Sequence, residues 1–127
     1  MSILVDSSIW IDYFRGNDQT GTVDLLIDEN LVFTNDLILA ELVPALQVRR
    51  QRSLVALLHQ IKRSPLAIDW QEIIAMQTTC LRNGVNGVGI PDLIIAQNAI
   101  QNGLNLLSVD RHFELMSRYL SLSLYEN

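Results

Sequence analysis

The sequence contains a single cysteine, few aromatic residues and no long apolar run, and each of these scarcities excludes a class of protein. Cys80 alone cannot form an internal disulfide, and one cysteine with two histidines is too few for a zinc site of ordinary spacing. The N-terminus reaches Asp6 after a run of three apolar residues, too short for the core of a signal peptide. We therefore expect a cytoplasmic protein with no membrane partner.

Aliphatic side chains supply most of the apolar content. Hydrophobic residues make up 49% of the 127 residues but aromatic residues only 6%, a balance that favours an α/β protein over an aromatic-rich β-sandwich. The chain is long enough to bury one core, and no repeat, low-complexity tract or linker divides it. The sequence thus predicts a single domain over residues 1–127.

Short apolar runs typical of strands alternate with segments of helical spacing along most of the chain. Parallel strands joined by helices are the simplest arrangement of such a pattern. We therefore predict an α/β fold, a three-layer α/β/α sandwich with a mainly parallel central sheet. The expected strands are 3–5, 31–34, 66–68 and 104–109, with an edge strand at 120–124, and the expected helices are 9–14, 23–28, 37–48, 53–63, 72–82, 91–102 and 113–116.

Pro44 lies within one of the predicted helices. A proline there removes the backbone donor that would bond to the carbonyl of Ala40. We expect it either to kink the helix or to mark the point where the helix really begins.

The balance of charge is acidic, which by itself argues against a nucleic-acid partner. The formal net charge is −5, whereas phosphate binding usually leaves a basic footprint. The distribution is uneven, because no acidic residue occurs between Glu41 and Asp69. Two interpretations remain open: a basic patch on an acidic protein, or solvated cations at helix ends. The basic residues of this interval are Arg49, Arg50, Arg52, Lys62 and Arg63, with His59 among them.

Four carboxylates lie in apolar contexts. Glu41 has apolar residues on both sides, so a charge at that point of a helix is costly unless something pairs with it. Asp6 and Asp110 each follow a predicted strand, and the carboxyl ends of parallel strands meet at one edge of a sheet. Asp92 stands at the start of an apolar helix.

Three of these acids also have an ordinary structural interpretation. Asp6 can cap the first helix, although Ser7 or Ser8 could do so instead. Asp110 can be a turn residue, and Asp92 can stabilise a helix dipole. The functional case is therefore joint, because four carboxylates converge only if something positive lies among them.

A divalent cation is the natural candidate. A set of Asp and Glu ligands without Cys or His suits Mg²⁺ or Mn²⁺ rather than zinc. Such a site indicates phosphoryl chemistry, because the metal holds a scissile phosphate, lowers the pKa of a bound water and stabilises the leaving oxygen. Ser7 and Ser108, each beside one of the acids, are candidates for orienting a carboxylate, a water or a phosphate, and turn or cap roles are equally open.

The motifs that contain these acids resemble those of the PIN-domain ribonucleases, and within them the VapC toxins of bacterial toxin–antitoxin pairs. The resemblance spans the whole chain and rests on four motifs in a fixed order. They are Leu4-Val5-Asp6-Ser7-Ser8 with Trp10 and Asp12-Tyr13-Phe14, then Ala40-Glu41-Leu42, then Gly89-Ile90-Pro91-Asp92-Leu93-Ile94-Ile95-Ala96, then Ser108-Val109-Asp110-Arg111-His112-Phe113.

The resemblance implies a metal-dependent endoribonuclease that acts as the toxin of a type II, VapBC-like pair. It also implies a cognate antitoxin as partner, an RNA substrate and a homodimer. By the same resemblance, Ser7 and Ser108 match hydroxyl positions of the motifs. The acidic quartet that would bind Mg²⁺ or Mn²⁺ and hydrolyse RNA phosphodiester bonds corresponds to Asp6, Glu41, Asp92 and Asp110.

The chain departs from the family pattern at two positions. Many relatives have a second acidic residue two places after the fourth acid, where this chain has His112, so any extra acidic metal ligand there is missing. Pro44 stands close after Glu41, where a small residue or glycine is more usual. The four acids themselves are all present.

Two other functions remain open. An Asp-based phosphoacceptor domain needs a lysine in its site, and Lys62, the only lysine, is predicted to lie on a helix rather than after a strand. A non-catalytic PIN-fold binding module would normally have lost one of the acids, and none is lost.

Overall fold

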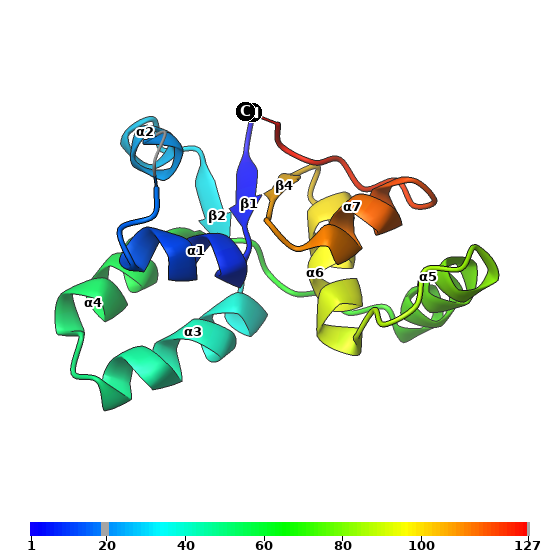
Figure 1. Ribbon diagram of the computed structural model, residues 1–127, viewed down its shortest axis with the longest axis horizontal. Helices are drawn as coiled ribbons and strands as arrows, with labels where there is room; N and C mark the ends of the chain where they lie inside the picture. Colours follow the sequence, from blue (N-terminus) through cyan, green and yellow to red (C-terminus); the bar gives the residue numbers. More distant parts are fainter. Residues whose placement is uncertain (19–20, 127) are drawn as a thin grey trace.

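The computed structural model describes residues 1–18 and 21–126, and it is the predicted three-layer α/β/α sandwich (Figure 1). Four strands form one parallel sheet with helices on both sides. The strands are β1 (Ile3–Val5), β2 (Val32–Thr34), β3 (Lys62–Arg63) and β4 (Asn105–Leu107), and the helices are α1 (Ser7–Phe14), α2 (Thr22–Asp28), α3 (Asp36–Val48), α4 (Arg52–Gln60), α5 (Trp70–Arg82), α6 (Ile90–Gln101) and α7 (Arg111–Ser117).

The core lies along β1 and the helices that cover it. All three residues of β1 are fully buried, as expected of a parallel strand that has helices on both faces. Helix α6 is buried over nearly its whole circumference, from Leu93 to Ala99. In Figure 1, α1 to α4 lie to one side of β1, and α5, α6 and α7 lie to the other.

The strand order, β3-β2-β1-β4, reverses direction at β1. From β1 the chain first builds outward through β2 and β3, and it then returns to place β4 on the opposite side of β1. In open parallel sheets, ligands bind outside the carboxyl ends of the strands at such a switch point. Val5 pairs with Leu107 at this edge, so the residues that follow β1 and β4 emerge side by side.

The structure corrects the sequence prediction around residues 53–68. The predicted helix 53–63 ends at Gln60, and the third strand is Lys62–Arg63 rather than 66–68. Pro65 has no N–H to continue the ladder after Ser64, whose N–H donates to the carbonyl of Thr34 at 2.7 Å. The carbonyls of the following segment bond instead to side chains of α6, so residues 64–69 form no regular element.

The predicted edge strand at 120–124 is only partly formed. The predicted alternation is present, because Leu122 is buried while Ser121 and Ser123 are exposed. Its pairing with β4 is an isolated parallel bridge between Leu106 and Leu124. The segment therefore extends the sheet by a single pairing.

Pro44 does not mark the start of a helix. Helix α3 begins at Asp36 and continues through Pro44 to Val48. Ala40 and Pro44 are both exposed, so the carbonyl that loses its partner lies on the solvent side of the helix, where it is open to water.

A buried pair of amides joins the two helices that carry Glu41 and Asp92. Asn35 caps α3 by accepting a hydrogen bond from the N–H of Ile38 at 2.9 Å. Its side-chain NH₂ donates to Oδ1 of Asn98 in α6 at 3.0 Å, and both asparagines are buried. The end of β2 is thereby fixed to the middle of α6. Among residues 1–18 and 21–126, no helix has the length and apolar content to cross a membrane.

Candidate metal and catalytic site

Asp6 is a buried carboxylate at the carboxyl end of β1, with 4% of its surface exposed. It occupies the N-cap position of α1, but its side chain makes no capping hydrogen bond. Instead, Oδ2 accepts hydrogen bonds from the hydroxyls of Ser8, at 2.8 Å, and Ser108, at 2.9 Å. Because both serines bond to the same oxygen, Oδ1 keeps its lone pairs for another partner. The helix-cap interpretation of Asp6 therefore does not hold.

The segment after β4 is arranged by the same hydroxyls. The Oγ of Ser108 also accepts from the N–H of Asp110 at 2.9 Å, and the Oγ of Ser8 accepts from the N–H of Val109 at 3.3 Å. Asp110 then caps α7, because its Oδ1 accepts from the N–H of His112 at 2.9 Å. Asp110 is therefore both an N-cap and a group facing the carboxyl edge of the sheet.

Asp92 stands in the first turn of α6, behind Gly89 and Pro91. Its Oδ2 accepts a long hydrogen bond, 3.4 Å, from the N–H of Gly89. Desolvation by burial raises the pKa of Asp92 most strongly, and the charges of Asp110 and Asp6 raise it further, while the Gly89 bond and His112 lower it. The helix terminus alone thus does not account for the surroundings of this carboxylate.

Glu41 projects from the exposed side of α3, which corrects the expectation that its apolar sequence neighbours place it in an apolar setting. Its carboxylate is nevertheless partly desolvated, and this desolvation is the largest cause that raises its pKa. The charges of Asp6 and Asp92 raise the pKa further, whereas a hydrogen bond with the side chain of Ser7 lowers it.

The four carboxylates act on one another electrostatically. Asp6 raises the pKa of both Glu41 and Asp92, and Asp110 raises that of Asp92. Within residues 1–18 and 21–126, no lysine or arginine forms an ion pair with any of the four. A cluster of anions without a lysine or arginine partner fits an external cation, and carboxylate and hydroxyl oxygens suit Mg²⁺ or Mn²⁺.

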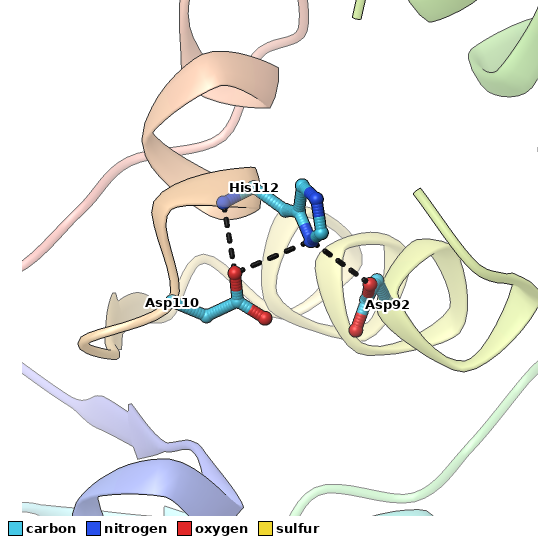
Figure 2. Close-up of side chains that lie close together, drawn as sticks. All are labelled: Asp92, Asp110 and His112. Atoms are coloured by element: carbon cyan, nitrogen blue, oxygen red, sulfur yellow. Dashed lines mark hydrogen bonds and ion pairs between the residues drawn. The ribbon is translucent and has the colours of Figure 1, made fainter. Parts of the chain in front are cut away.

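Two residues were not singled out by the sequence reasoning. Ser8 was considered only as a possible helix cap, yet it bonds to Asp6. His112 was read as the loss of an acidic ligand, yet its Nδ1 lies 3.3 Å from Oδ1 of Asp110 and 4.0 Å from Oδ2 of Asp92 (Figure 2). These three residues form a group whose ligand atoms all lie within 4.8 Å of one another. Their clustering depends on the meeting of α6 and α7, which no local pattern reveals.

The basic residues of the interval 41–69 do not form one continuous patch. Arg49, Arg50 and Arg52 are exposed at the corner between α3 and α4. Lys62 and Arg63 lie in β3, beyond the far end of α4, about 13 Å along that helix. Arg63 pairs with Asp36 at 3.3 Å, whereas none of the three arginines at the α3–α4 corner forms an ion pair among the described residues.

The raised pKa of Glu41 makes a prediction for the metal-free protein. The folded state holds a proton on Glu41 more readily than the unfolded chain, so this stabilisation is present below the ordinary pKa of 4.5 and is lost as the pH rises through the raised pKa. At pH 7, Glu41→Gln should therefore raise the free energy of unfolding, by about 0.5 kcal/mol because solvent screens a partly exposed charge. Urea titrations between pH 3.5 and 7.5 measure the difference.

The control is Glu126→Gln, which removes an exposed carboxylate near the end of the chain and should change stability little. Adding Mn²⁺ should reverse the order of wild type and Glu41→Gln, since a cation that binds the folded state stabilises it by mass action. A Glu41→Gln variant no more stable than wild type at pH 7 would contradict the account, as would a difference that persists at pH 3.5.

Solved structures with this fold include three VapBC proteins. VapBC2 from Rickettsia felis, bound to a DNA fragment from the VapBC2 promoter, is 20% identical with a TM-score of 0.78, and the match covers 98% of both chains. DNA-bound VapBC from Salmonella typhimurium is 13% identical with a TM-score of 0.76, and the match covers 98% of this chain and 97% of that one. VapBC-1 from nontypeable Haemophilus influenzae is 16% identical with a TM-score of 0.74, and the match covers 99% of this chain and 98% of that one.

At these identities the structural likeness establishes the fold alone. No curated protein matches the sequence. The family model described as PIN domain matches residues 3–119, which include all four carboxylates and nearly the whole chain. The chain therefore belongs to the PIN domain family.

Proposed function

We propose that this protein is a metal-dependent endoribonuclease and the toxin of a type II, VapBC-like toxin–antitoxin pair. The observation that carries the nuclease proposal is the group of four carboxylates at the switch point of the sheet. Their proximity raises the pKa of Glu41 and Asp92, and no lysine or arginine pairs with any of the four among the described residues. Membership of the PIN domain family, whose members are generally nucleases, supports it.

The proposed ligands of Mg²⁺ or Mn²⁺ are Asp6, Glu41, Asp92 and Asp110. A bound divalent cation would neutralise the scissile phosphate and make water a better nucleophile. Asp6 offers Oδ1 while Ser8 and Ser108 hold its other oxygen. Glu41 faces Asp6 and Asp92 closely enough that their charges raise its pKa in the metal-free protein, and a bound cation would relieve that repulsion. Ser7 and Ser108 are thus proposed as orienting residues.

The exposed corner between α3 and α4 is the proposed contact for the RNA backbone. A cavity of about 280 Å³ there is lined by Arg50, Arg52 and two glutamines. Arg50 adopts the left-handed conformation, with φ of 56°, at the point where α3 ends. The backbone favours glycine at such a position, but this chain has an arginine there. A phosphate contact gives that side chain a purpose.

A second cavity, of about 320 Å³, is the proposed seat of the antitoxin. It lies between α1, α3 and α4 and combines apolar walls with Arg15 and Arg49. Such a groove fits the apolar face of an amphipathic helix that carries acidic residues. Glu41 also lines this cavity, so a partner bound there would cover the site. The apolar lining residues are Ile11, Phe14, Leu42, Ala45, Leu46 and Leu54.

Helix α5 supplies the surface proposed for a homodimer. Trp70, Ile74 and Leu81 are more than half exposed, and their spacing places them along one face of the helix. An exposed apolar stripe of this kind is typical of an interface between protein chains.

The two rival functions find less support. The only lysine, Lys62, lies in β3, where it donates to the carbonyl of Asn30 and stands over the ring of Phe33. A phosphoacceptor site requires a lysine beside its acids, and no lysine accompanies the acids here. A binding module without catalysis has no need for four mutually repelling carboxylates.

Cleavage of total cellular RNA by the purified, antitoxin-free protein tests the proposal. Discrete fragments are expected with Mg²⁺ or Mn²⁺, and none with EDTA. Asp6→Asn and Asp92→Asn should each lower the rate by at least about 100-fold, because each removes a metal-binding charge. Circular dichroism should show that both variants are folded.

Asp28→Asn provides the matched control, since Asp28 is exposed at the end of α2. It should cleave at the wild-type rate. Absence of cleavage with either metal would favour the binding module, and equal cleavage by wild type and both site variants would show that the assigned site is wrong.

Arg50→Gly should separate stability from RNA binding. Glycine adopts the left-handed conformation without steric cost, so the free energy of unfolding should rise by about 0.5 kcal/mol. Binding of RNA, measured in an Asp92→Asn background to prevent cleavage, should weaken and lose about one counterion from its salt dependence.

Asn30→Gly is the control, because Asn30 is the other non-glycine residue with positive φ among those described, at 58°, and it lies at the end of α2. It should leave RNA binding unchanged. Unchanged RNA binding by Arg50→Gly as well would remove the α3–α4 corner from the substrate path.

A further inference from the structure

His112 contributes a nitrogen atom to a site that is otherwise made of oxygens. It is the second residue of α7, the helix that Asp110 caps. In Figure 2 the imidazole lies between the carboxylates of Asp110 and Asp92, and its Nδ1 edge faces both of them. The ring therefore joins helix α7 to the N-terminus of α6.

The distances suit a shared cation. Nδ1 is 3.3 Å from Oδ1 of Asp110 and 4.0 Å from Oδ2 of Asp92, and the ligand atoms of the three residues lie within 4.8 Å of one another. An ion bonded at about 2.1 Å to each of two ligands holds them about 3 to 4 Å apart. The three side chains can thus reach one ion with small adjustments.

The opposite edge of the ring lies close to the loop before α6. A Cβ added at Gly87 would lie 3.5 Å from Nε2 of His112, so the backbone of this loop borders that edge. Gly87 has a φ of 80°, a conformation that other residues rarely adopt. With Nε2 against the loop, Nδ1 is the nitrogen directed at the carboxylates.

We propose that His112 is a metal ligand through Nδ1 and that this nitrogen makes the centre select Mn²⁺ over Mg²⁺. The inference rests on the proposed metal-dependent function and deepens it. Mg²⁺ takes oxygen ligands almost exclusively, whereas imidazole is a good ligand for first-row transition metals. Replacement of a carboxylate by a histidine in the ligand set also leaves the site with less negative charge, which further disfavours the harder ion.

Electron spin-echo envelope modulation of Mn²⁺ bound to the purified protein tests the assignment without measuring catalysis. Wild type should show modulation from a directly bonded ¹⁴N nucleus. His112→Asn supplies oxygen in place of Nδ1, so the modulation should vanish and the ratio of the Mg²⁺ to the Mn²⁺ dissociation constants should fall by about tenfold. The wild-type spectrum is decisive even if the variant fails to fold.

The matched control is His59→Asn, because His59 is the only other histidine in the sequence. It is exposed at the end of α4, and its substitution should leave the ¹⁴N modulation in place. Bound Mn²⁺ without ¹⁴N modulation, or a ratio unchanged in folded His112→Asn, would overturn the role of His112 and leave the metal centre intact. Failure of wild type to bind Mn²⁺ would overturn both.

Discussion

Repulsion between carboxylates is the constraint around which this site is built. The charge of Asp6 raises the pKa of both Glu41 and Asp92, so the three carboxylates repel one another and would move apart if nothing else fixed their positions. Their positions are instead fixed by the backbone and by hydroxyl groups. Pairing of β1 with β4 places Asp6 beside Ser108, and the N–H groups of residues 109 and 110 hold the serine oxygens in turn.

Helices α3 and α6 are connected to each other beneath the carboxyl edge of the sheet. The buried bond between Asn35 and Asn98 connects the start of α3 to the middle of α6, and these are the helices that carry Glu41 and Asp92. Pairing of the strands thus determines the positions of Asp6 and Asp110, and the connection between α3 and α6 determines those of Glu41 and Asp92. Carboxylates held close together repel one another and lower the stability of the metal-free protein. The same closeness favours binding of a cation, because each carboxylate then attracts the ion.

The sequence predicted the fold well where a signal was local. Apolar runs located β1, β2 and β4, and helical spacing located the seven helices of residues 1–18 and 21–126 to within a few residues. It failed for β3, because Lys62 and Arg63 are exposed and polar, and their pairing with β2 is decided by where α3 and α4 return the chain. Segment 66–68 is apolar enough to resemble a strand, but Pro65 and the amides of α6 take its backbone out of the ladder.

The candidate site divides in the same way. Four acids in apolar contexts could be selected from the sequence because the cost of such charges is a local property. The partners of those acids could not, since the bond from Ser108 to Asp6 spans 102 positions and the approach of His112 to Asp92 depends on the packing of two helices. Exposure of Glu41 on the solvent side of α3 was likewise set by tertiary packing rather than by its neighbours in the chain.

The central claim is that the edge formed by β1, β4, α3 and α6 holds a divalent cation, and its most direct test is to locate that ion. Crystals of the antitoxin-free protein soaked in Mn²⁺ should give an anomalous difference peak within about 2.5 Å of carboxylate oxygens from at least two of Asp6, Glu41, Asp92 and Asp110. A site free of anomalous density at saturating Mn²⁺, or a peak confined to other surface acids, would contradict the account.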